Sequence, residues 1–223
     1  MVWGLLDRVG MLVIARWKPF LALSIVVLSL YGLSDTLGEA AQRIGDVREY
    51  YDGKVTIESN RITVERQDWT FILRPVERYE ISGKVIGKKS YSRGDPGHLV
   101  SPTDVALAWG DLISPEYEGD IKYNMGERQY FFTYYPRKGT KKLTAGYITT
   151  HSSDNHLIPA NEEIQKAVSG LKIGDMVTLY GRLVNIEGGN QKGETFNVKT
   201  SRSRSDSGPG SCEIIFLESI SIS

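Results

Sequence analysis

The apolar run from Phe20 to Leu33 constrains this chain most strongly, because it carries no charge and has basic residues on one side only. Arg16 and Lys18 precede the run, and the next ionisable residue after it is Asp35. A membrane span needs about 20 apolar residues, with about 17 as the lower limit. The run reaches that limit when its interfacial ends are included, so we expect one short transmembrane helix over residues 19–34.

Aromatic and aliphatic side chains of this segment are expected to anchor it in the lipid bilayer. They are Trp17, Phe20, Leu21, Ile25, Val26, Leu28, Leu30 and Tyr31. Residues 1–18 place apolar side chains at helical spacing beside few charges, which favours a helix lying in the membrane interface. The basic residues before the span and the acidic residues after it predict a cytoplasmic N-terminus and a periplasmic or extracellular C-terminal domain.

Two other interpretations of the apolar run stay open. A cleaved signal peptide also has a basic region, an apolar region and a small-residue cleavage site, for which Gly38-Glu39-Ala40 is a candidate. The long apolar stretch before Arg16 is unusual for a signal peptide and favours an uncleaved anchor. The run is also short enough to be a buried helix of a folded domain.

The charge balance and the cysteine content bear on the partners and on the fold. Lysine plus arginine and aspartate plus glutamate both number 27, so the net charge is zero and no nucleic-acid partner is expected. Cys212 is the only cysteine, so a domain outside the cytoplasm must rely on core packing rather than on an intrachain disulfide. Aromatic residues at 10% and 23 glycines favour β-rich structure with many turns.

The spacing of apolar residues changes from helical to alternating after the span. Residues 35–52 repeat apolar side chains in steps of three and four, which predicts a helical stalk. Over residues 53–77 apolar and polar residues alternate, as at Trp69, Phe71 and Leu73. This alternation predicts a β-meander of three short strands with one buried face.

Two glycine-containing strand patterns follow, one beginning at Tyr79 and one between Leu171 and Ile186. The second reads GDMVTLYGRLV and is preceded by an amphipathic helix over residues 161–171. Strands of this type resemble those of the five-stranded Greek-key barrels of the OB class, in which glycine lets the first strands bend. The resemblance implies that residues 78–223 form an OB-like barrel with one or two short helices, in a mainly β protein.

The histidines are expected in loops beside two short helices. His98 precedes a segment in which Pro102 would begin a helix with Asp104 in its first turn. His151 and His156 lie in a polar stretch that leads into the helix at residues 161–171. Three histidines with Cys212 or Asp154 could bind Zn or Cu if folding brought them together, although their spacing matches no known ligand motif and hydrogen-bonded loop histidines are the favoured interpretation.

Cys212 is the candidate nucleophile of an enzyme hypothesis. It would need His151 or His156 as its base and an acid such as Asp206 or Asp154 to orient that base. A lone cysteine at the start of an apolar strand is most often a small buried hydrophobic residue, so the sequence favours no catalytic site. No phosphate-binding loop or cofactor fingerprint is present, and no cofactor is expected.

These features predict an accessory, assembly or stabilising subunit of a membrane complex, held close to the bilayer by its anchor. Its contact surface is expected at Tyr130, Phe132 and Tyr134, in a strand that is rich in aromatic residues. The alternatives are an envelope Cys/His hydrolase or transpeptidase, and an OB-type oligosaccharide-binding module.

Overall fold

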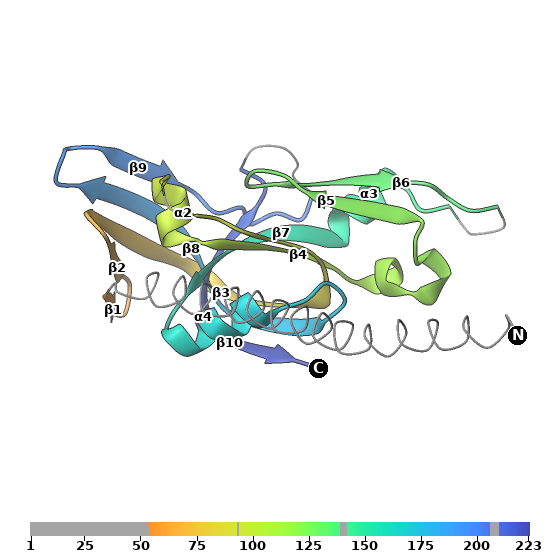
Figure 1. Cartoon of the computed structure of the whole chain (residues 1–223), viewed down its shortest axis with the longest axis horizontal. Helices are drawn as coiled ribbons and strands as arrows, with labels where there is room; N and C mark the ends of the chain where they lie inside the picture. The colour runs from red at the N-terminus through yellow and green to blue at the C-terminus, as the bar shows by residue number, and fades with distance from the viewer. Residues whose placement is uncertain (1–53, 93, 139–141, 206–209) are drawn as a thin grey trace, which may run out of the picture. The chain divides into compact units, whose positions relative to one another are not determined.

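The computed structural model describes residues 54–92, 94–138, 142–205 and 210–223 (Figure 1). The predicted interfacial helix, transmembrane helix and stalk lie outside these residues. In the described ranges, no helix combines the length and the apolar character that crossing a membrane requires.

The described part of the chain is mainly β, as the sequence predicts. The strands are β1 (Val55–Ile57), β2 (Ile62–Arg66), β3 (Trp69–Ser90), β4 (Thr103–Ala108), β5 (Ile121–Met125), β6 (Tyr130–Tyr134), β7 (Ser152–Pro159), β8 (Met176–Asn190), β9 (Thr195–Val198) and β10 (Glu213–Ile222). The helices are short: α2 (Pro96–Val100), α3 (Ala145–Thr150), α4 (Glu162–Gly170) and the 3-10 turns η1 (Gly110–Ile113) and η2 (Pro115–Tyr117).

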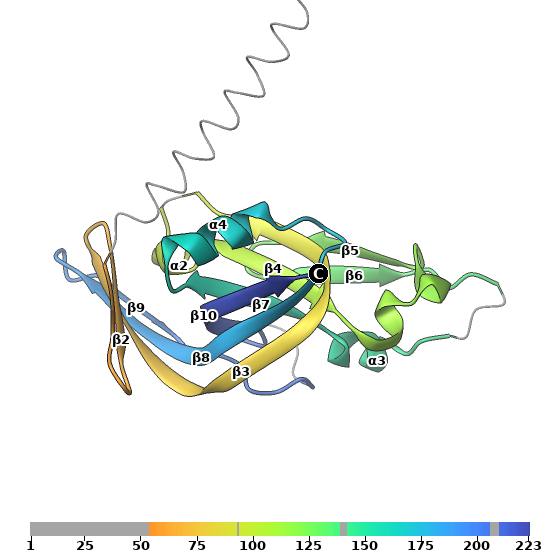
Figure 2. The ribbon, with the colours of Figure 1, turned by 90° about the horizontal axis from the view of Figure 1, so that it is seen from below.

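Five of the strands close into a ring of hydrogen-bonded neighbours in the order β3-β4-β7-β10-β8-β3. All neighbours in the ring are antiparallel except β7 and β10, which run parallel. Figure 2 shows β3 and β8 curving together along one side of the ring. The interior is filled by aliphatic side chains, among them Ile81, Val85, Val105, Leu107, Leu157, Leu179, Leu183, Ile215 and Leu217.

The long strands β3 and β8 extend beyond the ring. Their extensions pair with each other from Trp69 to Pro75 and add β2 and β9 as further neighbours. A second core lies there, with Phe71, Ile186 and Phe216 among its members. The predicted boundary between meander and barrel, after residue 77, falls inside β3, where the pairing register shifts between Pro75 and Glu77. One continuous strand therefore belongs to both predicted segments.

Helix α4 packs on the interior core, as its amphipathic pattern predicts. Ile164 and Val168 belong to that core, and the Asn161 side chain caps the helix by accepting from the Ile164 N–H at 3.0 Å. An Asn side chain satisfies amide groups that a helix start leaves without an intrahelical partner. The helix connects β7 to β8.

An antiparallel hairpin of β5 and β6 is inserted between β4 and β7 and lies beside them (Figure 1). Tyr130, Phe132 and Tyr134, the predicted contact surface, are half-buried: Phe132 and Tyr134 pack on a small core around Leu112 and Ile148, and the Tyr130 hydroxyl lies 2.7 Å from that of Ser152. The exposed large hydrophobic side chains in and next to β6 are Phe131 at 54% and Tyr135 at 64%. Successive side chains of a strand point to opposite faces, so Phe131 and Tyr135 lie on the face opposite to Tyr130, Phe132 and Tyr134.

Candidate functional site

The polar site lies on the outer face of β4 and β7. Along β4, Val105 and Leu107 point into the interior core, so Asp104 and its alternate neighbours face outward. In the register of the two strands Asp104 pairs with His156, and Ala106 pairs with Asp154. Two carboxylates and an imidazole therefore share one face, although the sequence suggests a helix for the first and a loop for the others.

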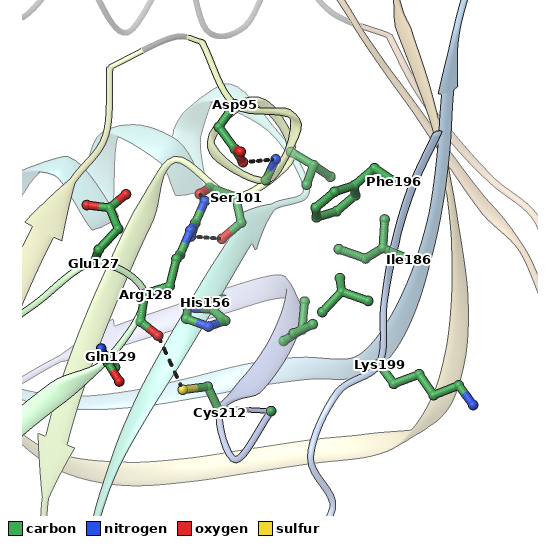
Figure 3. Close-up of a pocket in the computed structure, with 15 residues that line it drawn as sticks. Asp95, Ser101, Glu127, Arg128, Gln129, His156, Ile186, Phe196, Lys199 and Cys212 are labelled. Atoms are coloured by element: carbon green, nitrogen blue, oxygen red, sulfur yellow. Dashed lines mark hydrogen bonds between the residues drawn. The ribbon is translucent and has the colours of Figure 1, made fainter. Parts of the chain in front are cut away.

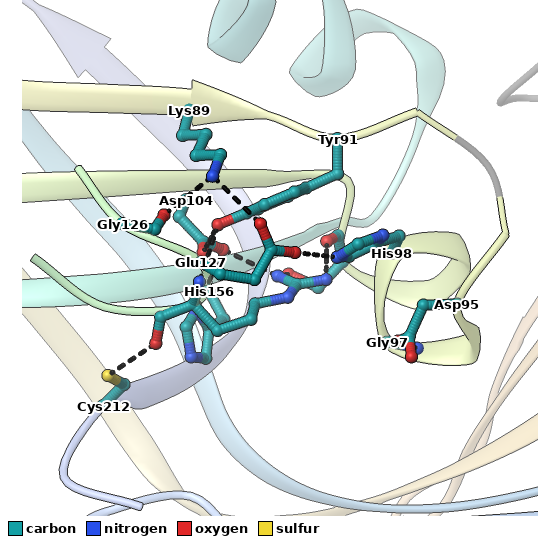
Figure 4. Close-up of polar contacts among 12 residues, drawn as sticks. Lys89, Tyr91, Asp95, Gly97, His98, Asp104, Gly126, Glu127, His156 and Cys212 are labelled. Atoms are coloured by element: carbon teal, nitrogen blue, oxygen red, sulfur yellow. Dashed lines mark hydrogen bonds and ion pairs between the residues drawn. The ribbon is translucent and has the colours of Figure 1, made fainter. Parts of the chain in front are cut away.

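Asp104 is fully buried and is surrounded by donors (Figure 4). Its Oδ1 accepts from Arg128 Nη1 at 2.7 Å and lies 2.8 Å from His156 Nδ1. Its Oδ2 accepts from the Tyr91 hydroxyl at 2.6 Å. A buried charge is tolerated when it is paired and hydrogen-bonded in this way.

Arg128 fastens the tip of the β5–β6 hairpin to the barrel. Its side chain donates to Asp104 and, through Nη2, to the Ser101 carbonyl at 2.7 Å, while its main-chain N–H donates to the Tyr91 hydroxyl at 3.0 Å. The residue adopts a φ of 55°, a conformation that non-glycine residues rarely occupy. Such strain persists where several contacts over-determine the geometry, and it is concentrated at functional positions.

Tyr91 stays a donor over the physiological range. Burial raises the pKa of its hydroxyl, and the hydrogen bond to Asp104 raises it further. The ring stacks on His98 at a centroid distance of 4.4 Å, and His98 Nε2 lies 2.8 Å from Glu127. A hydrogen bond from Lys89 lowers the pKa of the Glu127 carboxyl, and the contact with His98 lowers it as well.

Asp154 contrasts with Asp104. It is 2% exposed, and neither carboxylate oxygen has a hydrogen-bond partner in the described part of the chain. Burial raises its pKa to about 7, and the neighbouring charge of Asp104 adds to this effect. The charges of His156 and Arg128 oppose the rise, as does the main-chain N–H of Asn155, which lies nearby without the geometry of a full hydrogen bond.

A pocket of about 390 Å³ opens beside this cluster, which we call the hairpin pocket (Figure 3). One wall is apolar and consists of Val100, Ile186, Phe196, Val198 and Ile214, from α2, β8, β9 and β10. The opposite side carries polar groups of the hairpin tip, including Arg128 and Gln129, together with His156 and Cys212. Lys199 lies at its exposed rim.

A second pocket of about 340 Å³ shares Gln129 and Cys212 with the hairpin pocket. Asp154 lines this second pocket, whereas His156 lines the hairpin pocket. The cluster on β4 and β7 therefore borders two cavities.

The structure brings together only some of the residues that the sequence singles out. Cys212 and His156 line the same pocket, where the Cys212 thiol donates to the Arg128 carbonyl at 3.7 Å. His151 does not line that pocket: its ring stacks on Tyr147 at 3.8 Å. The carboxylate that contacts the His156 imidazole is that of Asp104, and Asp206 lies outside the described residues.

Sequence reasoning missed Asp104, Tyr91 and Arg128 as members of the site. The one signal for Asp104 was a charged residue within a short apolar stretch, which a helix assignment explained as a first-turn residue. The segment is instead strand β4, buried on both faces. Comparison with models of protein families, with curated proteins and with solved structures finds no match to this chain.

Proposed function

We propose that this chain is a membrane-anchored binding protein, an accessory subunit of a membrane complex whose OB-like barrel holds an apolar segment of a partner subunit in the hairpin pocket. The anchor is the predicted transmembrane helix at residues 19–34. The proposal concerns binding rather than catalysis.

The pairing of the strands supports an OB-like barrel. Numbered along the chain, the five strands of the ring pair in the order 1-2-3-5-4-1, and the third and fifth are the parallel pair. Helix α4 connects the third strand to the fourth. These features are similar to those of the five-stranded Greek-key barrels of the OB class.

The location of the hairpin pocket is the observation that carries the proposal. OB barrels bind ligands against strands two and three, between the loop that joins strands one and two and the loop that joins strands four and five. The first of these connections lines the pocket with Asp95, Gly97, Val100 and Ser101, and the second lines it with Phe196, Val198, Lys199, Gly210 and Cys212. His156 is added from the third strand. Its volume lies in the range of about 300–1,000 Å³ that is typical of ligand sites.

The chemistry of the pocket favours an apolar segment over a sugar chain. Its apolar wall is continuous, whereas the charged side chains opposite are engaged with other protein groups: Arg128 with Asp104, and Glu127 with Lys89 and His98. The β5–β6 hairpin also lies beside the second and third strands, where an extended oligosaccharide would bind.

The thiol geometry disfavours the hydrolase alternative. Cys212 and His156 share a pocket, and Asp104 contacts the imidazole, as a Cys–His–acid enzyme would require. However, the Cys212 thiol donates to a carbonyl oxygen, and this hydrogen bond stabilises the protonated thiol rather than the nucleophilic thiolate.

The test compares two substitutions on one short strand. Phe196→Asp puts a charge on the apolar wall, while Asn197→Asp puts the same group on the neighbouring, exposed position. We expect Phe196→Asp to reduce at least tenfold the partner subunit that co-purifies with the full chain in mild detergent, measured by quantitative mass spectrometry. Asn197→Asp should retain the wild-type amount.

Thermal unfolding followed by circular dichroism shows whether Phe196→Asp folds. Should it not fold, alkylation of Cys212 in the wild-type chain blocks the same pocket without a substitution and should release the partner. If the folded Phe196→Asp variant and the alkylated wild-type chain both retain as much partner as the untreated wild type, the hairpin pocket is not its binding site.

A further inference from the structure

Asp104, Asp154 and His156 place three metal-ligating side chains together on β4 and β7. One ligand atom from each lies within 4.8 Å of those of the other two. The strand register produces this arrangement, because Asp104 and His156 pair directly and Asp154 lies two residues before His156 on the same face. Their backbones are held by the ladder of the barrel rather than by a loop.

The second observation is the buried carboxylate of Asp154. It is 2% exposed, and both of its oxygens lack a partner among the described residues. Burying an unpaired carboxylate is strongly unfavourable, and buried charges are normally paired or bound to a metal. The Arg128 guanidinium donates a hydrogen bond to Asp104. Its positive charge also acts on Asp154, but only through space.

We propose that Asp104, Asp154 and His156 bind one divalent transition-metal ion, with Zn²⁺ as the best match. Two carboxylates and one imidazole form a ligand set that Zn²⁺ accepts, and three protein ligands leave the fourth position for water or a ligand group. Ca²⁺ is a poor match because it takes six to eight oxygen ligands, and Mg²⁺ strongly favours octahedral oxygen coordination.

Binding requires small side-chain movements. Ligand atoms around a tetrahedral Zn²⁺ lie about 3.3 Å apart, given metal–ligand bonds of about 2.0–2.1 Å. His156 Nδ1 would turn from Asp104 to the metal. Asp104 can keep its bonds from Arg128 and Tyr91, because a carboxylate has about four acceptor positions, and such outer partners orient metal ligands. The open position would face the cavities that His156 and Asp154 line.

The test uses the full chain in mild detergent, stripped with EDTA and exchanged into chelator-free buffer. Titration calorimetry with ZnCl₂ should give one ion per chain. Asp154→Asn and His156→Gln should each weaken binding at least tenfold, because each removes a ligand. The matched controls are Asp111→Asn, an exposed aspartate, and His151→Gln, a histidine outside the cluster, and both should bind as the wild type does.

Titration with Co²⁺ gives a second measurement. A four-coordinate Co²⁺ ion bound by Asp104, Asp154 and His156 should show d–d absorption in the visible range, and both ligand variants should lose this absorption. If one variant does not fold, the other provides the comparison. Absence of Zn²⁺ binding in the wild type would overturn the proposal, as would wild-type affinity in the folded ligand variants. Metal binding is measured without a partner subunit, so absence of metal binding would leave the proposed pocket interaction standing.

Discussion

At the scale of single residues, the buried side chains of Asp104 and Asp154 have the same chemistry but different hydrogen-bond surroundings. Asp104 accepts hydrogen bonds from Arg128 and Tyr91, whereas Asp154 has no partner for either oxygen among the described residues. Both lie on the same face of neighbouring strands. The hydrogen-bonding capacity of Asp104 is therefore used by its donors, whereas burial without a partner favours uptake of a proton or a cation by Asp154.

The raised pKa of Asp154 predicts a specific dependence of stability on pH. Between the ordinary value near 4 and the native value of about 7, the native state keeps a proton that the unfolded state has lost. Raising the pH through this window therefore lowers the free energy of unfolding, by an amount on the order of a few kcal/mol. Below about pH 4 the group is protonated in both states and adds no pH dependence.

Urea unfolding of wild-type and Asp154→Asn chains at about pH 4.5, near the lower end of this window, and at about pH 8, above it, measures this effect with EDTA present. Asp154→Asn should gain stability relative to the wild type as the pH rises, because Asn carries no titrating group. An identical pH dependence in the two proteins would show that Asp154 ionises normally in the native state.

The sequence identified part of this residue-level site. The chemistry of Cys212 and His156 makes them a candidate pair, and both line one pocket. The sequence favours a helix at Asp104, and Tyr91 and Arg128 belong to no recognisable motif. Their roles depend on contacts between segments far apart in the chain, such as Tyr91 with Asp104 and the hairpin tip, and local sequence patterns contain no information about such contacts.

At the scale of secondary-structure elements, alternation predicted strands with one buried face, but it did not predict β4 and β7, which are buried on both faces. The alternation over residues 53–77 indicates β2 and the first part of β3, and the glycine-containing pattern after Leu171 indicates β8. Strand β4 is buried at all six positions, and β7 is buried at all but His156. Without a period of two, such segments resemble short helices or loops in the sequence.

Gly181 lies where strands β8 and β10 of the ring approach each other closely. A Cβ atom there would overlap the carbonyl oxygen of Phe216 on β10, so Gly181→Ala must push β8 and β10 apart. We expect a loss of about 3 kcal/mol or more in the free energy of unfolding, the upper range for overpacking. The matched control is Gly189→Ala on the same strand, where the nearest atom would lie 3.8 Å away.

Urea unfolding of both glycine variants gives the comparison. Gly189→Ala should stay within about 1 kcal/mol of the wild type, as substitutions in open surroundings do. Equal effects of the two variants would mean that β10 does not lie against Gly181 in solution.

At the scale of the whole molecule, the anchor remains a prediction from hydropathy and charge. Paired substitutions Ile25→Arg and Leu28→Arg put two charges into the expected span, each unfavourable by about 2.5–3.5 kcal/mol at the centre of a helix. The variant should shift from the membrane pellet to the soluble fraction after carbonate extraction and ultracentrifugation. Leu37→Arg, in the predicted stalk, should stay in the pellet, and a membrane-bound double variant would contradict the predicted span.

The ring closes through its most distant partners, and this has a consequence for how the chain must fold. Arg74 on β3 bonds Glu187 on β8, 113 positions later, and β10, which completes the ring, is the last strand of the chain. Folding is slow in such a case, because the chain loses conformational entropy in closing a long loop before the contacts that stabilise the closed loop have formed. Strand β2 precedes β3 and β4 follows it closely, but the edge of β3 that pairs with β8 stays unpaired during synthesis until residues 176–190 have emerged. In that interval β3 depends most on protection from aggregation.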